Sequence, residues 1–251
     1  MSGSMQTYDT TLRDKVAGIG SSVTMDHAVS IARSVEKAGA ATIEAGYPAE
    51  SRVQRDIVRA VAAAVTGSEV AAAASCDAGE VAAAIEAVQH AAKPVVHVYL
   101  SAHEAREPEA RRHVCRAVRE AVAAVRSAGF QVQFAINGIE EMERPFRRHC
   151  IDVAVNAGAS RIGVPDSAGR ISATEHAALV RDTVQFVGPN VAVSVPRHLV
   201  CHGATESAAV IDVGGAAGAN RHAARAAMSR PGHQSWRCTV EVASLERPAR
   251  A

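Results

Sequence analysis

The chain has 251 residues and a formal net charge of +1 at pH 7, with 27 lysines and arginines against 26 aspartates and glutamates. This length suits one large α/β barrel or two modest domains, and the interspersed acids and bases give no electrostatic footprint for nucleic acid or an anionic membrane. The N-terminal stretch MSGSMQTYD lacks the basic and apolar regions of a secretion signal, and no apolar run is long enough to span a bilayer. We therefore expect a cytoplasmic protein that binds neither nucleic acid nor membranes.

The cysteines also favour a reducing compartment. They are odd in number, scattered along the chain and free of the Cys-x-x-Cys spacing found in redox and zinc motifs. They are Cys76, Cys115, Cys150, Cys201 and Cys238. Neither a disulfide framework nor a structural zinc site is expected.

The N-terminal half of the chain alternates predicted strands and helices. Residues 8–14 are predicted as a strand that runs directly into an arginine and an aspartate, and residues 15–22 as a loop. A helix over residues 24–38 shows apolar positions at helical spacing and ends at Gly39. The further predicted elements are strand 41–46, helix 51–65, strand 69–75, helix 78–92 and strand 94–100.

The same alternation continues to residue 195. A long charged helix ends at Gly129, and the predicted elements after it are strand 131–136, helix 140–157, strand 160–164, helix 173–187 and strand 190–195. Seven strand-then-helix repeats are typical of parallel strands joined by crossover helices. The predicted fold class is α/β, a (β/α)8 TIM barrel. A doubly wound open sheet is the alternative, although its glycine-rich phosphate loop is absent after the first strand.

Beyond Pro196 the pattern falters. Residues 197–251 are rich in alanine, arginine and histidine, with a weak strand candidate at residues 237–242. We therefore assign residues 1–196 to the barrel, with strands one to seven, and residues 197–251 to a divergent or abbreviated end. The barrel is either shortened or incomplete at this end.

The first chemically suggestive residues are Arg13 and Asp14. An arginine at the mouth of a strand can polarise a carbonyl or clamp a carboxylate, and an aspartate can hold a divalent cation through hard oxygen ligands. The alternative is a solvated ion pair beside a turn.

Three motifs in order resemble the metal-dependent acyl-CoA condensing and cleaving enzymes of TIM-barrel type. This family includes 2-isopropylmalate synthase, homocitrate synthase, citramalate synthase and hydroxymethylglutaryl-CoA lyase. The motifs are DTTLRD at residues 9–14, IEAGYPA at residues 43–49 and GASRIGVPDSAG at residues 158–169. The resemblance covers residues 6–196, and the second and third motifs look more like the synthase branch than the lyase branch.

The resemblance implies roles for the residues of the first two motifs. Asp14 would be a metal ligand, and Arg13 would neutralise the oxygen of a developing enolate or alkoxide. Glu44 would contact a 2-oxo acid or orient Arg13, and its alternative is an acid in water at the end of a strand. Arg13 and Glu44 are thus the predicted catalytic residues.

Four further residues are predicted to bind substrate. His97 matches a histidine that lines the pocket of the family, but it is equally a satisfied core residue. Asn137 stands where the family usually has an acid, so it can coordinate or hydrogen-bond but cannot act as a base. Ser160 and Asp166 are taken to close the sixth strand, and Asp166 either faces the cavity or serves a turn.

The predicted metal ligands after the seventh strand depart from the family. The family presents two metal-binding histidines one residue apart, whereas His198 and His202 are four residues apart, a spacing that reaches one ion only on a helix. The glycine-rich segment that shapes the acyl-CoA pocket of the family has no counterpart after residue 203. A divergent ending and a shifted reading frame both explain these departures.

The resemblance therefore implies an acyltransferase that condenses acetyl-CoA, as co-substrate, with a 2-oxo acid to give a 2-hydroxy diacid. It would use a divalent Mg, Mn or Zn ion and form a homodimer. The enolising base is unassigned. One alternative is a lyase that runs a retro-aldol or retro-Claisen cleavage on the same site, and another is a catalytically impaired barrel that acts as a binding or partner subunit.

Overall fold

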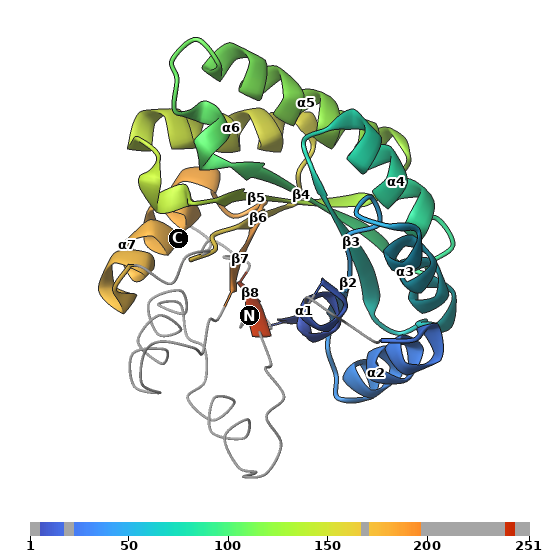
Figure 1. Cartoon of the computed structure of the whole chain (residues 1–251). Helices are drawn as coiled ribbons and strands as arrows, with labels where there is room; N and C mark the ends of the chain where they lie inside the picture. The colour runs from blue at the N-terminus through green and yellow to red at the C-terminus, as the bar shows by residue number, and fades with distance from the viewer. Residues whose placement is uncertain (1–5, 18–22, 167–170, 197–238, 244–251) are drawn as a thin grey trace.

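The computed structural model describes residues 6–17, 23–166, 171–196 and 239–243 (Figure 1). The strands are β1 (Gln6–Asp9), β2 (Thr42–Gly46), β3 (Glu69–Ser75), β4 (Pro94–Ser101), β5 (Gln131–Asn137), β6 (Arg161–Gly163), β7 (Ala192–Pro196) and β8 (Thr239–Ala243). The α-helices are α1 (Thr11–Ala17), α2 (Met25–Lys37), α3 (Arg52–Ala64), α4 (Ala78–Val88), α5 (Arg111–Ser127), α6 (Arg144–Ala157) and α7 (Ala173–Val187). Two short 3-10 helices, η1 (Ala102–Ala105) and η2 (Ile139–Glu141), follow β4 and β5.

The strands form a closed barrel in sequence order. Each strand from β1 to β7 pairs in parallel with the next, and helices α2 to α6 lie outside the curled sheet (Figure 1). The prediction of an α/β barrel of TIM type is confirmed. The last strand differs from the usual all-parallel pattern, because β8 pairs antiparallel with both β7 and β1. The residue range of this strand overlaps that of the weak strand candidate at residues 237–242. The division of the chain into a barrel at residues 1–196 and a divergent end at residues 197–251 stays a prediction.

The start of the chain corrects one expectation. The first strand ends at Asp9, and Arg13 lies on helix α1 instead of on the strand. The Asp9 carboxylate accepts a hydrogen bond from the Thr11 amide at 2.9 Å, which satisfies a free donor of the first helical turn. Leu12 and Val16, four residues apart, are both buried and give α1 an apolar face. Residues 15–17, predicted as the start of a loop, therefore belong to α1.

The helix after β5 also begins later than predicted. The expected start at residue 140 falls within η2, and α6 begins at Arg144 with Pro145 in its first turn. Proline is accommodated there because the first amides of a helix have no partner within the helix.

Side chains of each strand alternate between the helices and the barrel interior. Along β4, Val96, Val98 and Leu100 join the large core cluster that includes the helix residues, whereas Val95 belongs to a second cluster with Tyr8 and Ala71. His97 shares the face of Val95, two residues further along the strand. The interior of the barrel is therefore the face on which the predicted pocket histidine lies.

A buried ion pair occupies the end of the barrel where the strands begin. Arg161, the first residue of β6, contacts the Glu69 carboxylate at 3.1 Å, and the Thr42 hydroxyl donates a hydrogen bond to the same carboxylate. The guanidinium of Arg161 also lies 6.0 Å from the centre of the Tyr8 ring. These contacts join β1, β2, β3 and β6 across the interior.

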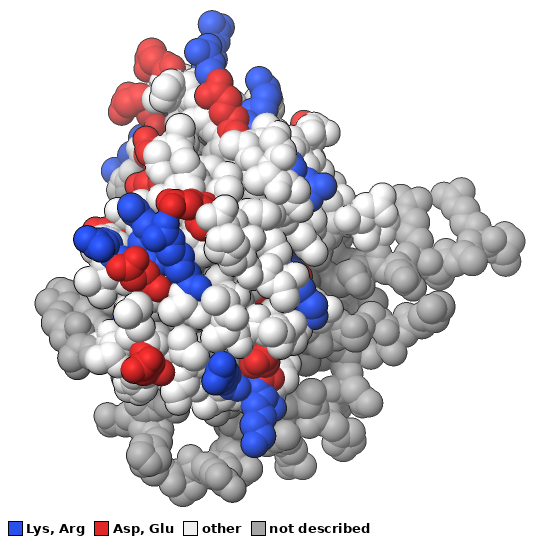
Figure 2. All heavy atoms as spheres, turned by 90° about the vertical axis from the view of Figure 1, so that its right-hand side faces the viewer, with Lys and Arg blue, Asp and Glu red and all other residues white. Residues whose placement is uncertain are grey.

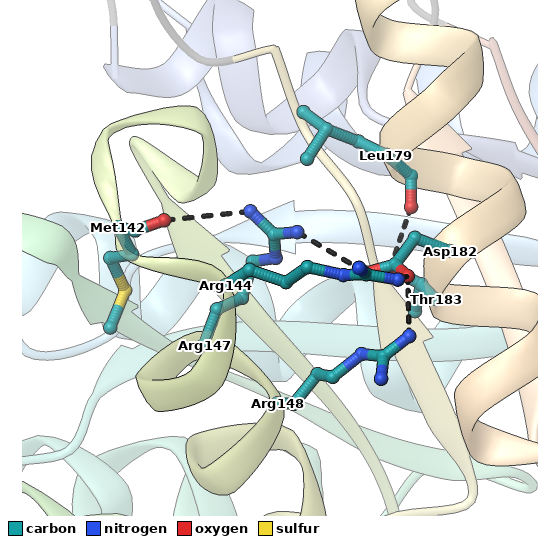
Figure 3. A network of polar contacts seen from close by, with 7 residues as sticks. All are labelled: Met142, Arg144, Arg147, Arg148, Leu179, Asp182 and Thr183. Atoms are coloured by element: carbon teal, nitrogen blue, oxygen red, sulfur yellow. Dashed lines mark hydrogen bonds and ion pairs between the residues drawn. The ribbon is translucent and has the colours of Figure 1, made fainter.

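The carboxylate of Asp182 on helix α7 contacts three arginines of α6 (Figure 3). Asp182 accepts hydrogen bonds from Arg144, Arg147 and Arg148, with 3.1 Å from Arg144 Nε and 3.2 Å from Arg147 Nη2. The bond from Arg144, aided by those from the other two arginines, outweighs burial and lowers the pKa of Asp182 below its ordinary value. Three cations thus converge on one anion at this helix pair.

The charges on the face shown in Figure 2 are mixed in sign. Ion pairs among the described residues at the surface include Arg59 with Glu86 and Arg52 with Asp56. Within the described ranges, no helix combines the length and apolar character needed to cross a bilayer.

The close approach of β5 and β6 gives a first prediction. A Cβ atom added at Gly163 would lie 2.9 Å from the Cβ atom of Ala135, so Gly163→Ala should destabilise the fold by about 1–3 kcal/mol through overpacking. Urea denaturation measures the loss. The double variant Gly163→Ala with Ala135→Gly removes the clash and should recover most of it. Equal stability of Gly163→Ala and the unchanged protein would contradict the packing described here.

The arginine cluster on Asp182 gives a second prediction. The Asp182 side chain is 14% exposed, and Asp182→Asn removes the charge that three arginines share, so we expect a loss of about 1–3 kcal/mol in urea denaturation. The matched control is Asp56→Asn, whose ion pairs with Arg52 and Arg59 are 3.7 Å long, and which should change stability by no more than about 0.5 kcal/mol. Hydrogen exchange should show the added opening in α7. If Asp182→Asn lost no more stability than the control, the contacts of Asp182 with the three arginines would not stabilise the fold.

Candidate active site

Arg13 and Glu44 meet at the end of the barrel where the strands finish. Arg13 Nη1 donates to Glu44 Oε2 at 2.8 Å, and Arg13 Nε and Nη2 donate to Asp14 Oδ1 at 2.9 and 2.8 Å. Glu44 reaches this position from the middle of β2 and is 0% exposed. Its burial excludes the alternative of an acid in water, and its contact with Arg13 matches the orienting role that was one of its two expected roles.

The second oxygen of the same carboxylate holds His97. Glu44 Oε1 lies 2.7 Å from His97 Nδ1, so one carboxylate joins α1 to β4. We call Arg13, Glu44 and His97 the carboxylate cluster. Burial alone would raise the pKa of Glu44, but the charge of Arg13 and the contact with His97 lower it to about 2. Glu44 is therefore ionised at neutral pH and holds two side chains.

Arg13 stays cationic in this setting. Burial would lower the pKa of Arg13, but Glu44, Tyr47 and Asp14 together raise it above its ordinary value. A guanidinium has five N–H donors, and the three bonds to Glu44 and Asp14 leave two for another acceptor. The Arg13 side chain is 18% exposed, so an oxygen atom of a ligand can reach it.

Aromatic side chains that we did not predict surround the carboxylate cluster. Tyr47 and Tyr99 meet edge to face with ring centres 6.2 Å apart, and Tyr99 lies 6.3 Å from the His97 ring. Burial raises the pKa of Tyr47 to about 12, so its phenol stays protonated at neutral pH. Tyr99 follows His97 by two residues on the same strand, and this spacing is the signal that places the two on one face.

Asp14 is the predicted metal ligand that the structure describes. Its side chain is 42% exposed, with Oδ1 held by Arg13 and Oδ2 accepting a hydrogen bond from the Thr10 hydroxyl at 3.2 Å. Within the described residues, no three side chains of histidine, cysteine, aspartate or glutamate gather closely enough to hold a metal ion. His198 and His202 lie outside the described residues. The described residues alone thus do not fit a metal ion, and the predicted site of Asp14 with these histidines stays a prediction.

The remaining predicted residues lie at opposite ends of the barrel. Asn137 is the last residue of β5, and Asp166 follows β6 and is 9% exposed, so both lie toward the carboxylate cluster's end of the strands. Ser160 precedes β6, and its hydroxyl donates to the Val132 carbonyl at 3.2 Å, near the start of β5. The expectation that Ser160 closes the sixth strand is wrong, since this strand begins at Arg161. Substrate binding by Asn137 and Asp166 stays a prediction.

Comparison with known proteins identifies close sequence relatives. Residues 4–221 match the family model described as HMGL-like. The 2-isopropylmalate synthase of Staphylococcus epidermidis strain RP62A is 32% identical over 202 residues, which cover 79% of this chain and 39% of that protein. The 2-isopropylmalate synthase of Staphylococcus aureus strain JH9 is 33% identical over 206 residues, which cover 80% and 40%. The chain thus spans about two fifths of the length of these relatives.

Solved structures agree on the fold. The HMG-CoA lyase of Bacillus subtilis superposes with a TM-score of 0.62 at 13% identity, covering 85% of this chain and 76% of that one. The HMG-CoA lyase of Brucella melitensis gives a TM-score of 0.58 at 15% identity, covering 82% and 78%. At these identities the likeness supports the barrel architecture.

The buried carboxylate gives a third prediction. Glu44→Gln leaves the Arg13 guanidinium without its buried counter-charge, so we expect a loss of about 3 kcal/mol in the free energy of unfolding at pH 7. The pKa of Glu44 is about 2 in the folded chain against an ordinary 4.5, so the stabilisation is present above pH 4.5 and is lost as the pH falls toward 2. Urea denaturation from pH 7 to pH 3 should therefore show the two proteins converging.

The control for this prediction is Glu86→Gln. Glu86 pairs with Arg59 on the surface, with side chains 49% and 41% exposed, and its loss should cost less than about 1 kcal/mol. A stability gap between Glu44→Gln and the unchanged protein that stays constant across the acid range would argue against an ionised Glu44.

Proposed function

The chain belongs to the HMGL-like family, and from this premise we propose that it is an acyltransferase that condenses acetyl-CoA with a 2-oxo acid. The product would be a 2-hydroxy diacid of the alkyl-malate type. The names of its 2-isopropylmalate synthase relatives support this choice. The observation that carries it in the structure is the buried Arg13–Glu44 pair at the finishing ends of the strands, the end at which TIM-barrel enzymes place their active sites.

Arg13 is the residue we assign to the oxo acid. Two of its N–H groups are free of the contacts to Glu44 and Asp14, and both belong to a cation that the cluster holds in place. A fixed cation lowers the energy of negative charge that develops on a keto oxygen when a carbon nucleophile adds to it. Glu44 keeps the guanidinium in position through the reaction.

Other residues complete the proposal at the same end of the barrel. Asn137 and Asp166 would contact the polar groups of the oxo acid, and Tyr47 and Tyr99 would shield it from water. A divalent Mg, Mn or Zn ion would be bound by Asp14 with His198 or His202. Because the described residues do not complete such a shell, we assign no step of the reaction to it.

The test is thiol release by the purified full chain. Acetyl-CoA is supplied with a panel of 2-oxo acids, in the presence of Mg²⁺, Mn²⁺ or Zn²⁺, and free CoA is measured with a thiol reagent. We expect release of CoA that depends on one oxo acid of the panel, together with a 2-hydroxy diacid detected by mass spectrometry. Cleavage of HMG-CoA or of a 2-hydroxy acid without any condensation would instead favour a lyase. Binding of an oxo acid without either reaction would favour a partner subunit.

The role of Arg13 gives a fourth prediction. Arg13→Gln removes the cation that faces the keto oxygen, so kcat/KM for thiol release should fall by about 100-fold or more. Arg13→Lys keeps the charge but loses the forked contact with Glu44, and it should recover part of the activity. Arg59→Gln on the surface of α3 is the control and should retain activity within about twofold of the unchanged protein. An Arg13→Gln variant as active as this control would refute the assignment.

A further inference from the structure

The two ring nitrogens of His97 have different surroundings. Nδ1 lies 2.7 Å from Glu44 Oε1, and Glu44 is an ionised carboxylate that only accepts hydrogen bonds. The proton of a neutral His97 ring therefore lies on Nδ1, as the hydrogen-bond network requires. Nε2 then carries a lone pair.

This lone pair has no partner within the described part of the chain. The Nε2 atom is buried from solvent, and no donor lies within hydrogen-bonding distance of it. A buried acceptor without a donor costs free energy and calls for a specific reason. Such an atom can accept a proton from a bound substrate.

The neighbours of His97 on the adjacent strands are uncharged. In the strand register, Ala73 of β3 and Gln133 of β5 lie beside it, and Tyr99 follows it on the same face. Of the charged groups, Glu44 faces it from β2 and holds Arg13 on its other oxygen. One carboxylate thus fixes the proton acceptor and the cation at the same end of the barrel.

We infer that His97 is the base that removes a proton from the methyl group of acetyl-CoA. This inference rests on the proposed function and assigns the enolising base that the sequence leaves open. Other groups near the cluster are less suited to the task. Glu44 has both oxygens engaged, the amide of Asn137 is not basic, and burial raises the pKa of Tyr47 to about 12 and that of Cys76 to about 12.

The step balances in the following way. The Nε2 lone pair of His97 takes the methyl proton, the C–H electron pair becomes the carbon–carbon double bond of a thioester enolate, and the carbonyl pair moves to the enolate oxygen. The enolate oxygen then re-forms the thioester carbonyl, the electron pair of the carbon–carbon double bond forms a bond to the keto carbon of the oxo acid, and the keto π pair moves to the keto oxygen, which becomes an alkoxide beside Arg13. The imidazolium returns its proton to that alkoxide, and water later hydrolyses the thioester to a carboxylate and free CoA. Glu44 stabilises the imidazolium in the interval.

The decisive variants are His97→Asn and His97→Gln. The amide nitrogen of asparagine overlays Nδ1 and keeps a donor for Glu44, whereas glutamine places its amide near Nε2, and neither amide is a base. We expect deuterium uptake from D2O into the methyl group of acetyl-CoA to fall by about 100- to 10,000-fold in His97→Asn. The KM for the most active oxo acid of the panel should stay within about threefold, because Arg13 and Glu44 remain in place.

Deuterium uptake is measured by mass spectrometry with the 2-hydroxy analogue of that oxo acid, which fills the site but cannot accept the carbon nucleophile. If the unchanged protein exchanges deuterium and His97→Asn exchanges it equally fast, the role of His97 is overturned while the proposed function stands. If the unchanged protein neither exchanges deuterium nor releases CoA with any oxo acid, the proposed function falls and takes this role with it.

A second measurement needs no turnover. In the chain labelled with ¹⁵N-histidine, the signals of His97 are assigned by their loss in His97→Asn. In the neutral form of the ring we expect the proton on Nδ1 and a bare Nε2. A neutral ring that carries its proton on Nε2 would overturn the inference whatever the activity of the chain, because the acceptor would then be absent.

Discussion

One buried carboxylate organises the end of this barrel at which the strands finish. Glu44 is 0% exposed, and its two oxygens are divided between Arg13 on α1 and His97 on β4. An ion buried so deeply is tolerated only when it is paired and hydrogen-bonded. Here its partners are Arg13, 31 residues before Glu44 in the sequence, and His97, 53 residues after it. The position of Arg13 in turn depends on the short helix that Asp9 caps. The positions of β2, α1 and β4 relative to one another thus depend on the same buried charge.

The barrel interior carries polar groups at both ends. The carboxylate cluster lies near the finishing ends of the strands, and the Arg161–Glu69 pair lies where β3 and β6 begin. Burial and the charge of Glu44 raise the pKa of the Tyr8 hydroxyl, and the charges of Arg161 and Glu69 also act on it. That hydroxyl has no hydrogen-bond partner of ordinary geometry within the described residues. Polar groups therefore lie at both ends of the interior, and the Tyr8 ring packs with Ala71 and Val95.

The sequence supports the alternation of strands and helices and the meeting of the Arg-Asp and Ile-Glu-Ala-Gly motifs, because parallel strands finish at one edge. It does not show that Arg13 lies on a helix, since seven residues are too few for a helical period to be visible. Ser160 was misplaced because it lies at the beginning of the short strand β6, and the beginning and the end of a strand lie at opposite ends of the barrel. Tyr8 was missed because its nearness to Glu44 depends on strand register, which propensity does not reveal, whereas the two-residue spacing of Tyr99 from His97 did carry a signal. The direction of β8 was equally hidden, since a run of β-formers looks the same in either orientation.

The reversed direction of β8 has a consequence for the architecture of the rim. In the strand pairing Thr239 lies opposite Asp9, and Val240 lies opposite Pro196, so the chain leaves β7 and enters β8 on the same side of the barrel as the carboxylate cluster. In an all-parallel barrel this connection would descend along the outer wall to reach the far side. Here Pro196 and Thr239, the described residues on either side of the connection, both stand on the rim that carries the carboxylate cluster.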